Sequence, residues 1–274
     1  TSEVSPYDST QVTLEIIWGQ LQVISDILEM KDEDNIAIIA TERALQPHLP
    51  PFDYLKSKCI KLNVGQEINL STLSTRLCEC GYTKSNNIDQ EGTWTRRGDI
   101  IDIYPVSSEL PIRLELFGDN IDKIKEFDPI SQRSLDKVEN VCITPTGFDP
   151  LIINKLISIK DKDISCLFTD EEYTQLIDSN TLISAKKYLG VAFNKPSSLL
   201  DYLGSNTFIV VDERLQGLSH GNAWYKIVNE SYHEEIKPTE SRKSIKKIYK
   251  PNLHINVNDI YDLLDKHKGI DITD

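Results

Sequence analysis

An acidic pair at the end of one apolar run could take part in nucleotide chemistry. Residues 208–211 are apolar and precede Asp212 and Glu213, and in P-loop NTPases a strand that ends in two acids positions magnesium and a water. Such a site also needs a glycine-rich loop that ends in Gly-Lys-Ser/Thr. None of the 12 glycines is followed by lysine. We therefore interpret the pair as the end of a core strand or a helicase relic, and expect no catalytic residue.

The spacing of cysteine and histidine argues against a metal site. Cys78 and Cys80 are separated by one residue, whereas cysteine pairs that bind zinc are usually separated by about two to four residues. The 5 histidines are scattered, and neither His-Glu-x-x-His nor Gly-x-Ser-x-Gly occurs. We expect no metal and no cofactor in this chain. The 5 cysteines, an odd number, do not form a disulfide framework and indicate a reducing, cytoplasmic location.

One strand-like run carries the most informative arrangement of side chains. Strict alternation along residues 112–117 sends a different set to each face. The sets are Ile112, Leu114 and Leu116 on one face and Arg113, Glu115 and Phe117 on the other. An aromatic beside an arginine on the polar face of a sheet is typical of protein interfaces. Alternation alone equally allows another part of the same chain to cover Phe117.

Composition limits the classes of partner. The chain has 274 residues, of which 39% are hydrophobic and 27% charged, so it is globular and long enough for two cores. Its formal charge of -13 opposes broad attachment to DNA or to anionic lipid. No apolar run approaches the roughly 20 residues that a bilayer needs, so we expect no membrane partner. The chain starts at Thr1 without a methionine or a leader, and we expect it to be a fragment of a longer protein.

Hydrophobic periodicity predicts an α/β body interrupted by a β-rich insertion. The first part has a helical pattern over residues 14–28 and then an apolar run, 35–40, predicted as a buried strand. From residue 60 we expect a short helix capped by Ser71 and ended by Gly81. An antiparallel meander follows, with predicted strands at 93–96, 100–104, 112–117 and 121–127.

The α/β character resumes after residue 145. Predicted helices cover residues 150–157, 170–177 and 258–267, and predicted strands cover 164–168 and 207–211. Residues 236–250 are rich in lysine and are interpreted as a solvated linker, although a contact with DNA stays open.

Three ordered blocks in the meander resemble a known module. The blocks are residues 92–105, 110–120 and 127–134. They are similar to the UvrA-binding domain shared by the repair helicase UvrB and bacterial transcription-repair coupling factors (Mfd). Three segments look more like the N-terminal, UvrB-homology region of Mfd than like UvrB. They are the block ending Ser-Gln-Arg-Ser and the upstream residues 5–8 and 64–67.

The resemblance implies a degenerate helicase-like (RecA-like) α/β body, made of residues 1–59 and 145–274 and split by an inserted β-rich α+β domain at 60–144. Such a body would have no ATPase activity. The resemblance also implies a DNA motor that uses ATP and magnesium and an RNA-polymerase-binding module, both outside this chain.

The resemblance also nominates site residues. In that family an arginine before the glycine of the first hairpin, an arginine on the next strand and an aromatic four residues later face UvrA. They match Arg97, Arg113 and Phe117 here, with Arg96 and Glu115 as neighbours that could contribute. The adjacency of Arg96 and Arg97 leaves open which guanidinium faces outward.

The leading hypothesis is a non-catalytic module that recruits UvrA to stalled RNA polymerase in transcription-coupled nucleotide excision repair. In the full-length family the UvrA-binding surface is masked by a C-terminal domain. The alternative is a fragment of an ATP-dependent UvrB-type DNA repair helicase, with Asp212 and Glu213 as metal-binding acids. A third option is an α/β scaffold with no partner of its own.

Overall fold

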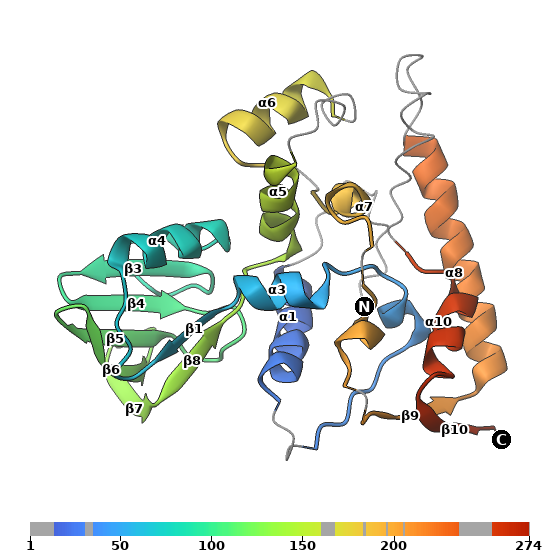
Figure 1. Ribbon diagram of the computed structural model, residues 1–274, viewed down its shortest axis with the longest axis horizontal. Coiled ribbons are helices and arrows are strands. Elements are labelled where there is room, and N and C mark those ends of the chain that lie inside the picture. The colour runs from blue at the N-terminus through green and yellow to red at the C-terminus, as the bar shows by residue number, and fades with distance from the viewer. Residues whose placement is uncertain are drawn as a thin grey trace. The chain divides into compact units, whose positions relative to one another are not determined.

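A computed structural model describes residues 14–30, 35–159, 168–182, 185–195, 197–204, 206–235 and 254–273. The described chain forms two compact units. The first, here called the sheet unit, contains α1 (Leu14–Glu29) and residues 53–151. The second, the body unit, contains residues 35–52 and the described residues from 152 onward. The mixed α/β character with an inserted β-rich sheet is confirmed (Figure 1).

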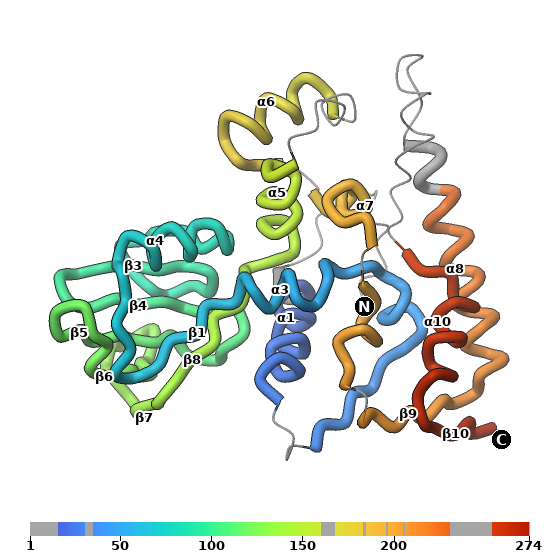
Figure 2. Tube along the Cα trace, viewed as in Figure 1, coloured from blue at the N-terminus to red at the C-terminus, as the bar shows by residue number. Residues whose placement is uncertain are grey.

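A six-stranded sheet forms the centre of the sheet unit, and its strands follow the chain order (Figure 2). They are β2 (Thr83–Lys84), β3 (Thr93–Arg97), β4 (Ile100–Tyr104), β5 (Ile112–Phe117), β6 (Asn120–Phe127) and β7 (Ser134–Val138). All neighbours are antiparallel except β2 and β3. Gly98 and Gly118 both have a φ of +63°, as the tight turns of these hairpins require. The predicted meander is thus confirmed.

One face of this sheet is covered by α4 (Leu70–Glu79), as Figure 1 shows. Leu73 and Leu77 of the helix share a buried core with Ile101, Ile103 and Leu114 of the strands. An antiparallel ribbon of β1 (Ile60–Asn63) and β8 (Asn140–Ile143) contributes to the same core. We call the opposite side of the sheet the outer face.

The predicted cap of α4 is wrong by two residues. Asn69, not Ser71, caps the helix, because its Oδ1 accepts a hydrogen bond from the backbone N–H of Thr72 at 2.9 Å. Ser71 lies in the first turn and donates its hydroxyl to the same oxygen. Gly81 follows the end of the helix as predicted, with a φ of +90°.

An ion pair lies on the outer face between β4 and β5. The Asp102 carboxylate, which is 2% exposed, accepts hydrogen bonds from Nε and Nη2 of Arg113 at 2.7 and 2.9 Å. The guanidinium carbon stands 4.7 Å from the centre of the Phe127 ring, and Nη1 donates to the carbonyl oxygen of Gln132 at 3.4 Å. The pair therefore joins two strands and the loop that follows β6.

The remaining helices are short apart from one. They are α2 (Glu42–Leu45), α3 (Phe52–Lys58), α5 (Phe148–Ser158), α6 (Asp170–Asp178), the 3-10 turn η2 (Ala185–Tyr188), α7 (Leu189–Ala192), the 3-10 turn η3 (Leu199–Tyr202), α8 (Arg214–Glu235) and α10 (Val257–Leu264). Helix α10 begins after Asn256, whose side chain accepts from the N–H of Asn258, and it is shorter than predicted.

Two parallel strands, β9 (Phe208–Asp212) and β10 (Lys268–Ile272), form the only sheet of the described body unit. Val211 packs with Val257 and Ile260 of α10. The predicted strand at 35–40 is wrong, because this run pairs with neither β9 nor β10 and leaves Ile39 fully exposed. Most of the predicted strand at 164–168 and all of the lysine-rich residues 236–250 lie outside the described residues.

Removal of Arg113 is expected to destabilise the sheet unit. Arg113→Ala leaves the Asp102 carboxylate buried without its partner, which should lower the free energy of unfolding by about 3 to 5 kcal/mol. Lys123→Ala, at an exposed ion pair, should leave it nearly unchanged, because solvent screens that pair. Urea unfolding measures both. Asp102→Asn added to Arg113→Ala should restore part of the loss, and a wild-type midpoint for Arg113→Ala would contradict this account.

Stability is expected to fall on acidification because of a buried histidine. Burial, Lys186 and His48 lower the pKa of His254 to about 3, whereas an unfolded chain would titrate it near 6.5. Between pH 6.5 and about pH 3 only the unfolded chain binds the proton. The free energy of unfolding therefore falls by about 1.4 kcal/mol for each pH unit in this range. The wild type should lose roughly 2 kcal/mol of unfolding free energy between pH 7 and pH 5 through His254. His254→Asn should not show this part of the loss. Equal losses in the two proteins would contradict the assignment.

Candidate protein-interaction surface

Strand pairing decides which side chains share the outer face. Ile100 lies opposite Arg97 on β3 and opposite Glu115 on β5, and Asp102 lies opposite Arg113. Residues directly opposite each other project to the same side of a sheet. Arg97, Arg113 and Glu115 therefore lie on the outer face, and alternation along β5 adds Phe117.

The same pairing separates the two adjacent arginines. Arg96 lies opposite Ile101, which belongs to the core under α4. Its side chain therefore projects to the helix side of the sheet, where its Nε donates to the carbonyl oxygen of Gly98 at 3.0 Å. Arg97 is the arginine that shares the outer face with Phe117.

Phe117 is the most prominent apolar side chain of this face. It is 82% exposed, while Leu116 and Leu114 beside it are buried. The predicted alternation along β5 is thus confirmed in full. Because the buried neighbours Leu114 and Leu116 anchor the strand, Phe117 presents apolar area at the surface that a partner can cover.

Arg113 lies on the predicted face, but its guanidinium is not free to donate a bidentate pair of hydrogen bonds to a partner protein. Its Nε and Nη2 already bond to Asp102, and only 17% of the side chain is exposed. Most of the hydrogen-bonding capacity of Arg113 is thus used within the chain. Arg113 supports the surface. The sequence pattern did not reveal this role, because the partner of Arg113 is Asp102 on the neighbouring strand.

Charge on the outer face is mostly balanced within the chain. Glu115 is paired with Lys125 and lies 3.9 Å from Lys123, which also contacts Asp122 at 2.9 Å. These carboxylates raise the pKa of Lys123, with the Asp122 hydrogen bond as the largest cause. Arg97 is exposed and donates from Nη2 to the backbone carbonyl oxygen of Asn86.

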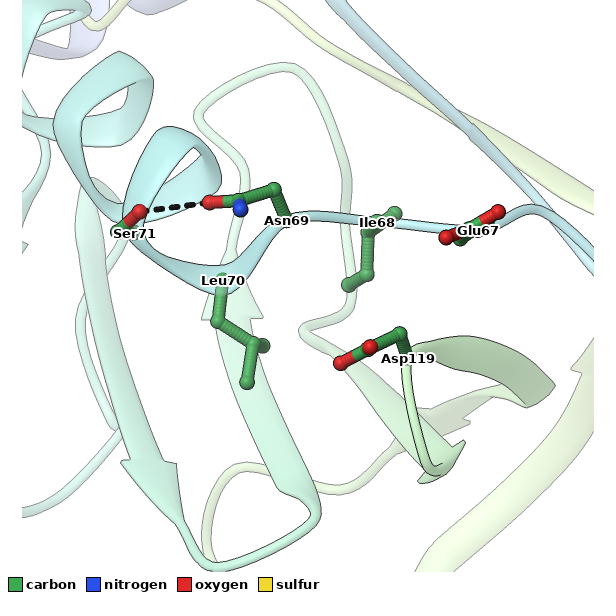
Figure 3. Close-up of a pocket in the computed structure, with 6 residues that line it drawn as sticks. All are labelled: Glu67, Ile68, Asn69, Leu70, Ser71 and Asp119. Carbon is green, nitrogen blue, oxygen red and sulfur yellow. Dashed lines mark hydrogen bonds between the residues drawn. The ribbon is translucent and has the colours of Figure 1, made fainter.

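A pocket of about 460 Å³ opens near the first turn of α4 (Figure 3). Its lining is Glu67, Ile68, Asn69, Leu70, Ser71 and Asp119. Figure 3 shows Ser71 bonded to Asn69, whose oxygen is used as the helix cap. The pocket offers two carboxylates and no basic group, and no cluster of metal ligands occurs among the described residues.

The acidic pair stands at the junction of β9 and α8. Asp212 is the last residue of β9, and Glu213 turns the chain with a φ of +49°. The carbonyl oxygen of Glu213 accepts hydrogen bonds from the N–H groups of Gln216 and Gly217 in the first turn of α8. The next residue, Arg214, pairs with Asp265 and Asp271. The geometry is that of a strand-to-helix junction closed by ion pairs.

Two further features concern the described helices and the described cysteines. None of the helices in the described residues combines the length and the apolar character needed to cross a bilayer. The described cysteines, Cys59, Cys78, Cys80 and Cys142, are all free thiols.

Comparisons with known proteins match this domain and the segments around it. Residues 60–147 match the UvrB interaction domain. A transcription-repair-coupling factor of Bacillus subtilis (strain 168) is 33% identical over 196 residues, 64% of this chain and 16% of that protein. The one from Haemophilus influenzae is 26% identical over 265 residues, 94% of this chain and 22% of that protein. UvrABC system protein B of Thermosipho africanus is 36% identical over 127 residues, 46% of this chain and 19% of that protein.

These alignments fix what the chain is related to. It spans between 16% and 22% of the length of these relatives. Because the six-stranded sheet and its outer face lie inside the matched segment, the surface described above belongs to a domain with known relatives. Residues 60–147 are a UvrB interaction domain, and the chain is homologous to the N-terminal region of transcription-repair-coupling factors and to UvrB.

Proposed function

We propose that this chain is a non-catalytic recruitment module whose inserted domain docks the damage-recognition protein UvrA. It would bring UvrA to stalled RNA polymerase in transcription-coupled nucleotide excision repair. The observation that carries the proposal is Phe117, an 82% exposed aromatic on the outer face of a UvrB interaction domain. Buried or half-buried aromatic anchors in complexes are among the side chains that contribute most to binding.

Two supporting features distinguish this role from a general scaffold. The outer face has a fixed shape, because the Arg113–Asp102 pair joins β4 to β5. It also carries an exposed arginine, Arg97, on β3, two strands away from the aromatic on β5. Aromatic and arginine side chains together are typical of specific protein interfaces.

The UvrB-type helicase fragment is the less favoured function. The UvrABC system protein B relative aligns over 127 residues, whereas the transcription-repair-coupling factors align over 196 and 265. The sequence contains no glycine followed by lysine and hence no phosphate-binding loop. We infer that the body unit is a degenerate helicase-like (RecA-like) domain without ATP or magnesium of its own.

The wider setting is part of the same proposal. RNA polymerase and DNA would be bound through other regions of the full-length protein, and one of its C-terminal domains would mask the UvrA-binding surface. A cytoplasmic location fits this role. A chain without the masking domain should bind UvrA constitutively.

Loss of the exposed aromatic is expected to weaken binding without affecting the fold. Phe117→Ala should reduce the affinity for UvrA of the same organism by about 2 kcal/mol, the scale of a central anchor. Titration calorimetry measures the affinity. Since the side chain is 82% exposed, the melting temperature should stay within about 1 °C of the wild type.

Two control variants make this measurement decisive. Leu114→Ala, three residues earlier and fully buried, should lower the unfolding free energy by about 2 to 5 kcal/mol. Leu215→Ala, at an 80% exposed leucine of α8, should change neither binding nor stability. The proposed surface is refuted if Phe117→Ala binds UvrA as tightly as Leu215→Ala does.

The chain is expected to lack ATP hydrolysis. Because no Gly-Lys-Ser/Thr loop is present in the sequence to hold phosphates, phosphate release should stay at background with or without DNA. Asp212→Ala should leave that background unchanged. Turnover that disappears in Asp212→Ala would instead support the helicase alternative.

A further inference from the structure

The outer face carries a second exposed apolar residue that the family resemblance does not nominate. Ile100, the first residue of β4, is 36% exposed and lies opposite Glu115. Phe117 is two residues farther along β5 on the same face. Diagonal neighbours of this kind have Cβ atoms roughly 7 to 8 Å apart, within reach of an aromatic ring.

Charge along the row that contains Ile100 is asymmetric. The row runs from Arg97 through Ile100 and Glu115 to Lys123. Glu115 and Lys123 already contact opposite charges. Among the described residues, no carboxylate pairs with Arg97, which bonds only to a backbone carbonyl oxygen. The row therefore presents one uncompensated cation, Arg97, directly opposite the apolar side chain of Ile100.

We propose that Ile100 and Phe117 together receive one apolar side chain of the docking partner, next to a partner carboxylate that pairs with Arg97. This inference rests on the proposed function, because it describes how the same surface selects its partner. Ile100 is thereby a specificity-determining residue of the surface. Glu115 acts differently, since its contacts with Lys123 and Lys125 keep both lysines from attracting further acidic groups.

The packing of Ile100 makes the test practicable. The side chain lies beside the Gly98 turn at the beginning of its strand, and its neighbour Ile101, not Ile100, belongs to the buried core. Truncation at Ile100 should therefore leave the melting temperature nearly unchanged. Val64 offers a matched control, because it is a β-branched residue of the same unit with 38% exposure.

The experiment compares the affinity of the chain for UvrA of the same organism among wild type, Ile100→Ala, Ile100→Glu, Phe117→Ala, the double alanine variant and Val64→Ala. Ile100→Ala should weaken binding about 5- to 10-fold, and Ile100→Glu more, because its carboxylate faces the acidic group of the partner. The double variant should lose less than the product of the single losses, because both residues contact one group. Val64→Ala should bind within about twofold of the wild type.

The outcomes separate this inference from the proposed function. If Phe117→Ala weakens binding while Ile100→Ala and Ile100→Glu bind like Val64→Ala, the inference is overturned and the proposed function stands. If the single losses at Ile100 and Phe117 multiply fully, the shared contact is overturned. If the wild-type chain does not bind UvrA, both the inference and the proposed function fail.

Discussion

The bidentate pair between Arg113 and Asp102 is the constraint on which the outer face depends. A carboxylate that is 2% exposed cannot stay charged without a close counter-ion, so the pair fixes the register of β4 against β5. The same guanidinium stacks over Phe127 and bonds to Gln132, which ties the loop after β6 to the sheet. The residues that face solvent, Ile100 and Phe117, are placed by this fixed register.

Two residues of β5 have different roles: Arg113 stabilises the sheet, and Phe117 is exposed for contact with a partner. Arg113 and Phe117 are both on the outer face, yet the first is mostly covered and the second is 82% exposed. An arginine that is already paired with a carboxylate adds rigidity to the sheet, whereas an exposed aromatic adds apolar area that a partner can cover. A loss of binding after substitution of Arg113 could thus come from unfolding as well as from lost contacts. Substitutions of Phe117 and Ile100 test the contacts alone.

The sequence predicted those features that depend on local pattern. Alternation along β5 correctly assigned Leu114 to the core and Phe117 to the outer face, and Gly81 correctly marked the end of α4. Features that depend on pairing were missed. The partner of Arg113 could not be identified because alternation gives a face but not a register, and β4 and β5 are joined by a long turn. Residues 35–40 have a strand composition, but a strand also needs a neighbour to satisfy its backbone, and this run has none among β9 and β10.

Net charge and local charge lead to different conclusions for this chain. A total of -13 disfavours non-specific attachment to phosphates, while the row through Ile100 presents Arg97 as a single uncompensated cation. Such an arrangement attracts a partner only where an acidic group and an apolar group lie at matching positions, because the overall charge repels other acidic surfaces. This combination suits the proposed docking role, since the negative total charge disfavours phosphate backbones while Arg97 still favours an acidic group of a protein partner. The acidic composition is in this respect a contribution to specificity.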